Sequence, residues 1–311
     1  MRIATLNAQN LRLRQGEAGA ALDGARDRDD PLDTGPGARA LDRIDRDLTA
    51  EVLARADADV IALQEVFDAA TLDHFHDTCL APAGLSPYPH RICLPGNDGR
   101  GLDLALLSRL PCATVDSHAH LTPEDLDIPP ASPADAGRPL FRRDCLIARI
   151  GRITLFVCHL KAPYPDADAA WPVRRMEALA VRRLVEARFA DRSEGYWLIL
   201  GDLNEPRLPP AGHRPAIAPL LEDFAVDLLT RLPEGQRWSF FEPHARRYSR
   251  PDALLASPAL ARDWAAAMPR VLRLGLGHEA ARYPGPRLPG VGAHRPHASD
   301  HAALVVDFPG L

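Results

Sequence analysis

The segment 197–206 joins a run of apolar residues to two polar side chains that could hold a metal ion or activate water. Four apolar residues precede Gly201, and Asp202 and Asn204 follow with one residue between them. Because strand residues two apart point to the same side, a strand that continues through this stretch projects both side chains from one edge of the core. The alternative is an ordinary Asx turn after a strand.

The same pattern recurs along the chain, with polar side chains at the edges of apolar runs. These residues are Asn7, Glu65, His159, Asp202, Asn204, Asp252, Asp300 and His301. A single such His or Glu is more often structural or solvated, but eight are not expected by chance. Carboxylate and amide oxygens without thiolates favour Mg²⁺, or Mn²⁺, over zinc. The pattern therefore predicts a divalent-cation site built from distant segments.

Apolar runs of strand length separate these residues and would bring them to one edge of a core. We predict strands at 2–7, 59–65, 102–108, 145–150, 153–159, 197–200, 237–241, 251–255 and 302–308. Apolar residues at helical spacing predict amphipathic helices at 41–52 and 173–187, and 220–229 suggests a shorter one. With no internal repeat or clear linker, we expect a single layered α/β domain over residues 1–311.

Two segments read as irregular. Residues 14–38 are rich in Gly, Pro and mixed charge, and such a segment buries too little apolar area to offset its ordering entropy. We therefore expect a flexible loop near Asn7. An acidic metal-binding loop is the less favoured alternative, because arginines would neutralise the aspartates. The Pro-rich segment 121–139 is expected to be a long surface excursion.

Composition bounds the class of protein. The net charge of −5 argues against tight, nonspecific nucleic-acid binding through an overall basic field, while local arginine clusters keep specific contacts open. Five cysteines without zinc spacing indicate reduced core residues. The chain as given shows no signal peptide and no apolar run of membrane-spanning length, so we expect a cytoplasmic protein without stable membrane association.

The ordered set of motifs resembles the endonuclease/exonuclease/phosphatase superfamily, which includes deoxyribonuclease I and inositol polyphosphate 5-phosphatases. The matching pieces are Thr5-Leu6-Asn7, Gln64-Glu65, His159-Leu160-Lys161, Gly201-Asp202-Leu203-Asn204, Asp252 and Ser299-Asp300-His301. They come in the family order and span nearly the whole chain. The resemblance implies a four-layer α/β sandwich, two packed mixed β-sheets flanked by helices, that hydrolyses phosphoesters.

The resemblance also implies roles for individual residues. Glu65 would be the principal Mg²⁺ ligand, helped by Asn7 and Asp300, and the number of metal ions stays open. Asp202 would orient or deprotonate the attacking water. Asn204 would hold a phosphate oxygen, His301 oriented by Asp252 would act on the phosphoryl group, and His159 would add a second donor.

Two cationic residues are candidate substrate contacts. Phe141-Arg142-Arg143-Asp144 resembles a deoxyribonuclease I segment whose Arg meets the phosphate backbone, so Arg143 is a candidate, with a solvated Arg as the alternative. Lys161 is a candidate because it lies two residues from His159. Asp103 is a candidate partner of His159, with a structural salt bridge as the alternative. Pro251 and Ala253 depart from the residues that usually flank the family acid matched by Asp252.

The substrate stays open between two classes of phosphoester. A Mg²⁺-dependent phosphodiesterase, most of all a nuclease, is favoured, and abasic-site enzymes are disfavoured because they lack a His at the position of His159. The first alternative is a small or lipid phosphoester such as an inositol phosphate or sphingomyelin, although no amphipathic stretch suggests membrane docking. The second is a non-catalytic binding scaffold of the same fold.

Overall fold

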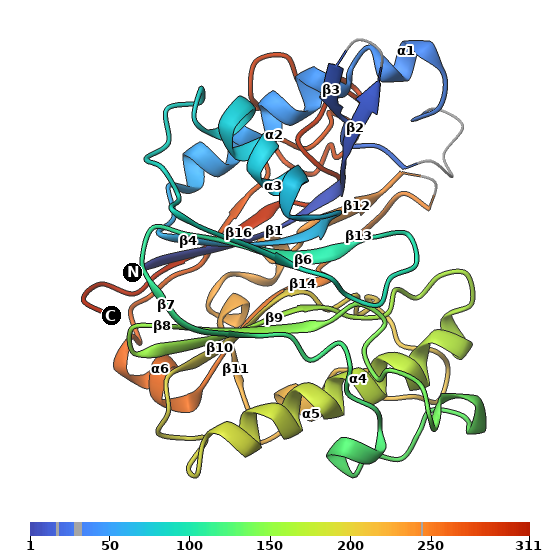
Figure 1. Ribbon diagram of the computed structural model, residues 1–311, viewed down its shortest axis with the longest axis vertical. Helices are drawn as coiled ribbons and strands as arrows, with labels where there is room; N and C mark the ends of the chain where they lie inside the picture. Colours follow the sequence, from blue (N-terminus) through green and yellow to red (C-terminus); the bar gives the residue numbers. More distant parts are fainter. Residues whose placement is uncertain (17–18, 28–32, 244) are drawn as a thin grey trace.

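The computed structural model describes residues 1–16, 19–27, 33–243 and 245–311, which form two large sheets covered by helices (Figure 1). The strands of the first sheet, in spatial order, are β15 (Arg270–Leu272), β16 (Ala303–Asp307), β1 (Arg2–Leu11), β4 (Val60–Val66), β6 (Asp103–Ser108) and β5 (His90–Leu94). Those of the second are β11 (Val226–Asp227), β14 (Asp252–Ala256), β10 (Trp197–Asp202), β9 (Ile153–His159), β8 (Cys145–Ile150) and β7 (Cys112–Asp116). Both sheets are mixed, with one parallel pair each, β1 with β4 and β9 with β10.

Helices cover the outer face of each sheet. The α-helices are α1 (Pro36–Arg39), α2 (Asp42–Ala56), α3 (Ala69–Phe75), α4 (Ala167–Arg188), α5 (Ala218–Leu221) and α6 (Pro258–Asp263). Shorter helical turns are η2 (His76–Leu80), η3 (Glu124–Leu126), η4 (Pro133–Asp135), η5 (Leu228–Arg231) and η6 (Glu234–Gln236). In Figure 1, α2 and α3 lie over the first sheet and α4 and α5 over the second, which confirms the four-layer α/β sandwich. In the described part of the chain, no helix is long and apolar enough to cross a membrane.

The strands are continuous apolar runs because each sheet is buried on both faces. On β10, Leu198 and Leu200 pack between the two sheets, together with Ile3 of the first sheet. Trp197 and Ile199 point the other way and pack under α4. Alternation of side chains along a strand therefore places successive apolar residues in two different cores.

The segment 14–38, expected to be an irregular loop, contains regular structure in its described part. Strands β2 (Leu13–Gly16) and β3 (Gly19–Leu22) pair as a hairpin, and α1 begins at Pro36. The prediction failed because charged residues here neutralise one another. Asp23, buried, pairs with Arg14 at 2.9 Å and with Arg26 at 3.3 Å, so a polar segment can be covered without an apolar surplus. Residues 17–18 and 28–32 of this segment lie outside the described residues.

Three further expectations change in detail. The predicted helix at 220–229 is instead α5, β11 and the start of η5, because Phe224 packs its ring against Trp197 at 5.2 Å and the chain then pairs with β14. The segment 121–139 carries η3 and η4, and Ile128 is buried in the core under α4. The predicted strand at 237–241 is β12 (Phe240–Glu242), which pairs with β13 (Arg247–Ser249).

Candidate active site

Three strands of the second sheet bring three polar side chains into one row. Asp202 ends β10 and lies opposite His159, the last residue of β9, and opposite Asp252, the first residue of β14. Because β14 runs antiparallel to β10, its first residue reaches the edge at which β9 and β10 end. Neighbouring strands lie about 4.8 Å apart. The sheet register alone therefore gathers three of the predicted residues.

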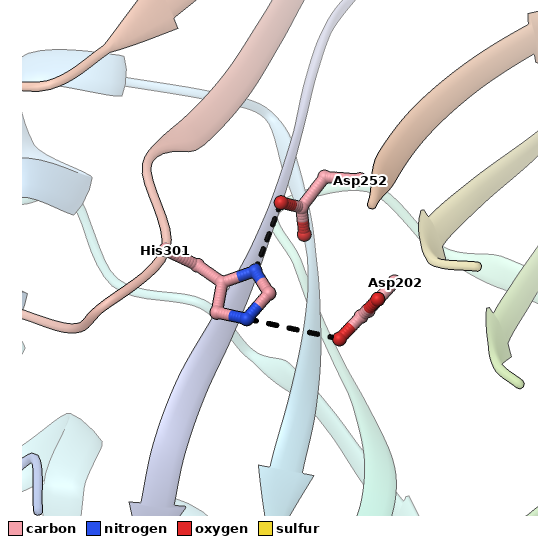
Figure 2. A group of neighbouring side chains, drawn as sticks. All are labelled: Asp202, Asp252 and His301. Carbon is pink, nitrogen blue, oxygen red and sulfur yellow. Dashed lines mark hydrogen bonds and ion pairs between the residues drawn. The ribbon is translucent and has the colours of Figure 1, made fainter. Parts of the chain in front are cut away.

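His301 completes this row from a loop that precedes β16 (Figure 2). Its Nδ1 lies 2.9 Å from Asp252 Oδ2, and its Nε2 points to Asp202 Oδ2 at 3.9 Å. Ser239 Oγ donates to the same Asp252 oxygen at 2.6 Å, and the Phe240 ring lies 4.8 Å from the imidazole. The imidazole is thus held at Nδ1, and Nε2 faces the site.

The charges of this group shift its protonation. Burial alone lowers the pKa of His301, but Asp252, Asp300 and Asp202 outweigh it and raise the pKa well above 6.5. Burial raises the pKa of Asp202 to about 6, with Asp252 adding to the rise and His301 opposing it. At neutral pH the arrangement therefore supplies an imidazolium donor beside a carboxylate acceptor.

Asn7 joins the two sheets at this edge. Its Nδ2 donates to Asp202 Oδ2 at 3.1 Å and lies 3.3 Å from Glu65 Oε1. Its Oδ1 accepts from the Gln9 backbone N–H at 3.0 Å. In this orientation Asn7 links the carboxylates through its nitrogen, and direct ligation of a metal through Oδ1 requires the amide to turn over.

Glu65 and Asp300 lie beside this row. Glu65 Oε2 accepts from the Asn10 backbone N–H at 2.9 Å. Burial raises the pKa of Asp300 to about 7, and Glu65 and Asp202 add to the rise while His301 opposes it. The Asp300 side chain is 31% exposed, so a cation can reach it. Crowded carboxylates of this kind are relieved by a bound cation, and an oxygen donor set fits Mg²⁺.

Among the described residues, a neighbouring group of two carboxylates and one histidine is also close enough together to hold a metal ion. Asp202, Asp252 and His301 have atoms within 4.8 Å of one another. His301 Nδ1 is occupied by Asp252, and Mg²⁺ prefers oxygen ligands to imidazole. Glu65 and Asp300 therefore remain the candidate cation ligands, and His301 remains the candidate for proton chemistry.

Unusual backbone conformations gather at the site. Positive φ angles occur at Gln9 (46°), Asn10 (56°), Glu65 (64°) and Asn204 (53°). The pairing of β1 with β4 shifts register between Asn7 and Leu11, and that of β4 with β6 shifts around Glu65. Bulges re-aim side chains, and residues other than Gly with positive φ often mark functional sites. The orientation of the Glu65 side chain is therefore set by the register shift of β4 and by the positive φ of Glu65.

His159 and Asn204 lie on the other side of Asp202. His159 Nε2 is 3.6 Å from Asp202 Oδ2, and its Nδ1 is buried without a hydrogen-bond partner among the described residues. Burial, followed by the Arg143 guanidinium, holds the pKa of His159 well below 6.5. Asn204 donates to Leu160 O at 3.0 Å, and its backbone N–H donates to Asp202 Oδ1 at 2.8 Å. A neutral imidazole and an amide therefore flank the carboxylate.

The cationic candidates are less free than expected. Arg143 is 5% exposed, and it donates to Leu160 O at 3.2 Å and pairs with Asp98 at 3.0 Å. Lys161 Nζ donates to the carbonyl oxygens of Ala162 and Tyr164, at 2.9 and 2.5 Å. The suggested pairing of Asp103 with His159 is wrong: Asp103, on β6 of the first sheet, accepts from the Gly96 N–H at 2.9 Å, and His159 faces Asp202 instead.

Two supporting residues escaped the sequence analysis. The Gln9 side-chain oxygen accepts from the Asp300 N–H at 3.0 Å and contacts His297 Nε2 at 2.9 Å. Its position two residues after Asn7 was the available signal, since strand residues at that spacing share a side. Ser239, which holds Asp252, had no comparable signal, because it lies outside every predicted motif.

The comparisons with known proteins agree with this geometry. A family model described as Endonuclease/Exonuclease/phosphatase family matches residues 4–301. No curated protein matches the sequence.

Three of the matching solved structures are covered over nearly their whole length, as is this chain. An endonuclease/exonuclease/phosphatase family protein from Leptotrichia buccalis has a TM-score of 0.55 at 14% identity, covering 99% of this chain and 98% of that chain. An AP endonuclease from Archaeoglobus fulgidus has 0.57 at 16% identity, covering 99% of each. A mannosyl-6-phosphatase from Bacteroides thetaiotaomicron has 0.56 at 14% identity, covering 99% and 98%. At these identities the likeness shows the fold.

Proposed function

Because the chain belongs to the endonuclease/exonuclease/phosphatase family, we propose that it is a Mg²⁺-dependent phosphodiesterase that acts on nucleic acid. The observation that carries the proposal is the row of His159, Asp202 and Asp252, completed by His301 and flanked by Glu65 and Asp300. We also propose that residues 1–311 form one catalytic domain, since both sheets contribute to this site.

The proposed chemistry divides between the two sides of the site. Glu65 and Asp300 would hold the cation, and bound Mg²⁺ supplies positive charge that stabilises phosphoryl oxygens. Asp202 Oδ2 would accept a proton from the attacking water, because its pKa of about 6 leaves it mostly ionised at neutral pH and still basic.

The histidines and Asn204 act as donors and positioning groups. His301 Nε2–H would donate to the phosphoryl group, with Asp252 holding the ring through Nδ1. The neutral His159 would add a second donor, and the second N–H of the Asn204 amide would hold a phosphate oxygen. In-line displacement at phosphorus is favoured by hydrogen-bond donors that are already in position when charge develops in the transition state.

All five cysteines are free thiols in the structure. Free thiols are the ordinary state in a reducing compartment, and this supports the further proposal that the protein is cytoplasmic.

A substrate panel tests the proposal. Single- and double-stranded DNA, RNA, inositol phosphates and sphingomyelin are each incubated with the protein in Mg²⁺ and in EDTA. We expect Mg²⁺-dependent cleavage of a nucleic acid. Cleavage of inositol phosphates or sphingomyelin alone would replace the nuclease assignment while keeping the chemistry, and hydrolysis of no substrate would favour a binding scaffold.

A further inference from the structure

The loop between β5 and β6 is held firmly against both halves of the site. At one end, the Asn97 N–H donates to Arg143 O at 2.9 Å, and Asn97 Nδ2 donates to Phe141 O at 2.9 Å. At the other end, Gly101, with φ of 80°, lies so near Phe67, two residues after Glu65, that an added Cβ would come to 3.0 Å from the ring. The loop therefore spans from the residue that follows β4, the strand of Glu65, to the segment that carries Arg143.

Asp98 at the centre of this loop holds two arginines. Its carboxylate pairs with Arg143 Nε at 3.0 Å and with Arg100 Nη2 at 3.0 Å. Arg100 Nε also lies 3.1 Å from Asp98 Oδ1, so the contact is bidentate. The two guanidinium groups and one carboxylate leave a net charge of about +1 on this cluster, because arginine stays protonated in proteins.

The two arginines differ sharply in exposure. The Arg143 side chain is 6% exposed, whereas that of Arg100 is 65% exposed. Arg143 is tied to the site, because Leu160 O accepts from both Arg143 Nη1 and Asn204 Nδ2. Arg143 is thus the buried anchor of the cluster and Arg100 its solvent-facing end.

Arg100 also lies within electrostatic reach of both sides of the site. The hydrogen bond to Asp98 and, to a smaller extent, the charge of Glu65 raise the pKa of Arg100. Arg100 in turn contributes, after burial, Arg143 and His301, to the lowered pKa of His159. Arg100 Nε–H and one Nη2–H point to Asp98, so its Nη1 N–H groups and the second Nη2–H are the ones that can bind a second phosphate.

We propose that Arg100, held by Asp98 and Arg143, is a specificity-determining residue that binds a second phosphate of the substrate, next to the phosphoryl group that reacts. This inference rests on the proposed function and deepens it. The favoured source of the second phosphate is the neighbouring phosphodiester of a polynucleotide, and a second phosphate on a small molecule has the same chemistry.

The test compares substrates with one and two phosphates. The kcat/KM values of the wild type, Arg100→Ala and Arg100→Lys are measured in Mg²⁺ on the thymidine dinucleotide and on the same dinucleotide with a terminal phosphate at either end. Inositol monophosphate and bisphosphate form the small-molecule arm. The control is Arg262→Ala, because Arg262 is 57% exposed and ion-paired to Glu194 but lies on α6 at the opposite edge of the sheet.

We expect the wild type to prefer the phosphorylated dinucleotide and Arg100→Ala to lose that preference by about tenfold or more, the scale of a hydrogen bond to a charged group. Arg100→Lys should keep only part of the preference for the phosphorylated dinucleotide. Arg262→Ala should keep all of it. A preference seen only between the inositol phosphates would overturn the polynucleotide assignment. If Arg100→Ala lowered kcat/KM equally with and without the terminal phosphate, or did not lower it at all, the subsite would be overturned while the proposed function stands. A wild type that cleaves neither these substrates nor the DNA and RNA of the substrate panel would overturn both the subsite and the proposed function.

Discussion

His301 Nδ1 lies 2.9 Å from Asp252 Oδ2, although the two residues are 49 positions apart and come from a loop and a strand start of different sheets. The carboxylate fixes the ring so that Nε2 faces Asp202. A buried carboxylate paired with an imidazole sets both the orientation of the ring and its protonation. The relationship links the two sheets through the proposed reaction centre.

The first prediction concerns this pair. Asp252→Asn keeps the size of the side chain but removes the charge that stabilises the imidazolium, so kcat on a cleaved substrate should fall by about 10²- to 10⁴-fold. Steady-state kinetics measure the fall in kcat, and circular dichroism checks that the variant is folded. Asp116→Asn, at an exposed carboxylate paired with Arg188, is the control and should change neither kcat nor the circular dichroism spectrum. A rise in KM at constant kcat would contradict the positioning role.

The second prediction concerns the cation. Glu65→Gln replaces a carboxylate oxygen with an amide and should abolish Mg²⁺-dependent hydrolysis. It should also remove the rise in melting temperature that Mg²⁺ gives the wild type, since a ligand stabilises the state to which it binds. Differential scanning fluorimetry with and without Mg²⁺ reads this independently of activity. Exposed Glu234 provides the matched variant Glu234→Gln, which should behave as wild type. Full Mg²⁺ stabilisation of Glu65→Gln would rule out Glu65 as a ligand.

The third prediction is a pH dependence of stability away from the site. His294 lies between Asp33 and Glu279, at 3.2 and 2.8 Å, and their hydrogen bonds raise its pKa to about 10. Below about pH 6.5 the ring is protonated in both the folded and the unfolded state, so the full stabilisation is present. Between about 6.5 and 10 the unfolded state loses its proton first, and stability falls as pH rises.

Urea denaturation from pH 6 to 9.5 measures this effect as a difference between wild type and His294→Gln. The difference should shrink as pH rises, with a limiting slope of about 1.4 kcal/mol per pH unit for one proton. His120→Gln, at an exposed histidine, should run parallel to wild type. A difference that stays constant with pH would mean that the ion pairs are not formed in solution.

The sequence predicted the parts of the site that follow from strand ends. Asp202, His159 and Asp252 could be found because each stands where an apolar run meets a polar residue, and β-sheet register then aligns them. The orientation of the Glu65 side chain could not be predicted, because it depends on a β-bulge that the periodicity of apolar residues does not reveal. Arg143 was expected to be a substrate contact, with a solvated Arg as the alternative, and its burial could not be foreseen because it depends on Asp98, 45 positions away. A local bulge in one case and a long-range ion pair in the other are therefore what the sequence pattern did not reveal.

The fourth prediction concerns Gly201, directly before Asp202. Its φ is 124°, and a Cβ there would come far inside van der Waals distance of Cys158 O and would also crowd Gln64 Nε2. The backbone of β10 therefore approaches β9 and the other sheet closely, and that approach requires a glycine. Gly201→Ala must either strain this backbone or separate the strands whose ends carry His159 and Asp202.

We expect Gly201→Ala to lower the free energy of unfolding by about 2 kcal/mol or more, the range of strained backbone and overpacked sites. Urea denaturation measures the loss, and two controls divide its causes. Gly212→Ala has a positive φ of 79° but no atom near the added Cβ, so it isolates backbone strain. Gly37→Ala has neither feature and should stay within about 0.5 kcal/mol of wild type. If Gly201→Ala lost no more than Gly212→Ala, the close approach of β10 to β9 would not limit this position, and Asp202 would not owe its placement to the glycine before it.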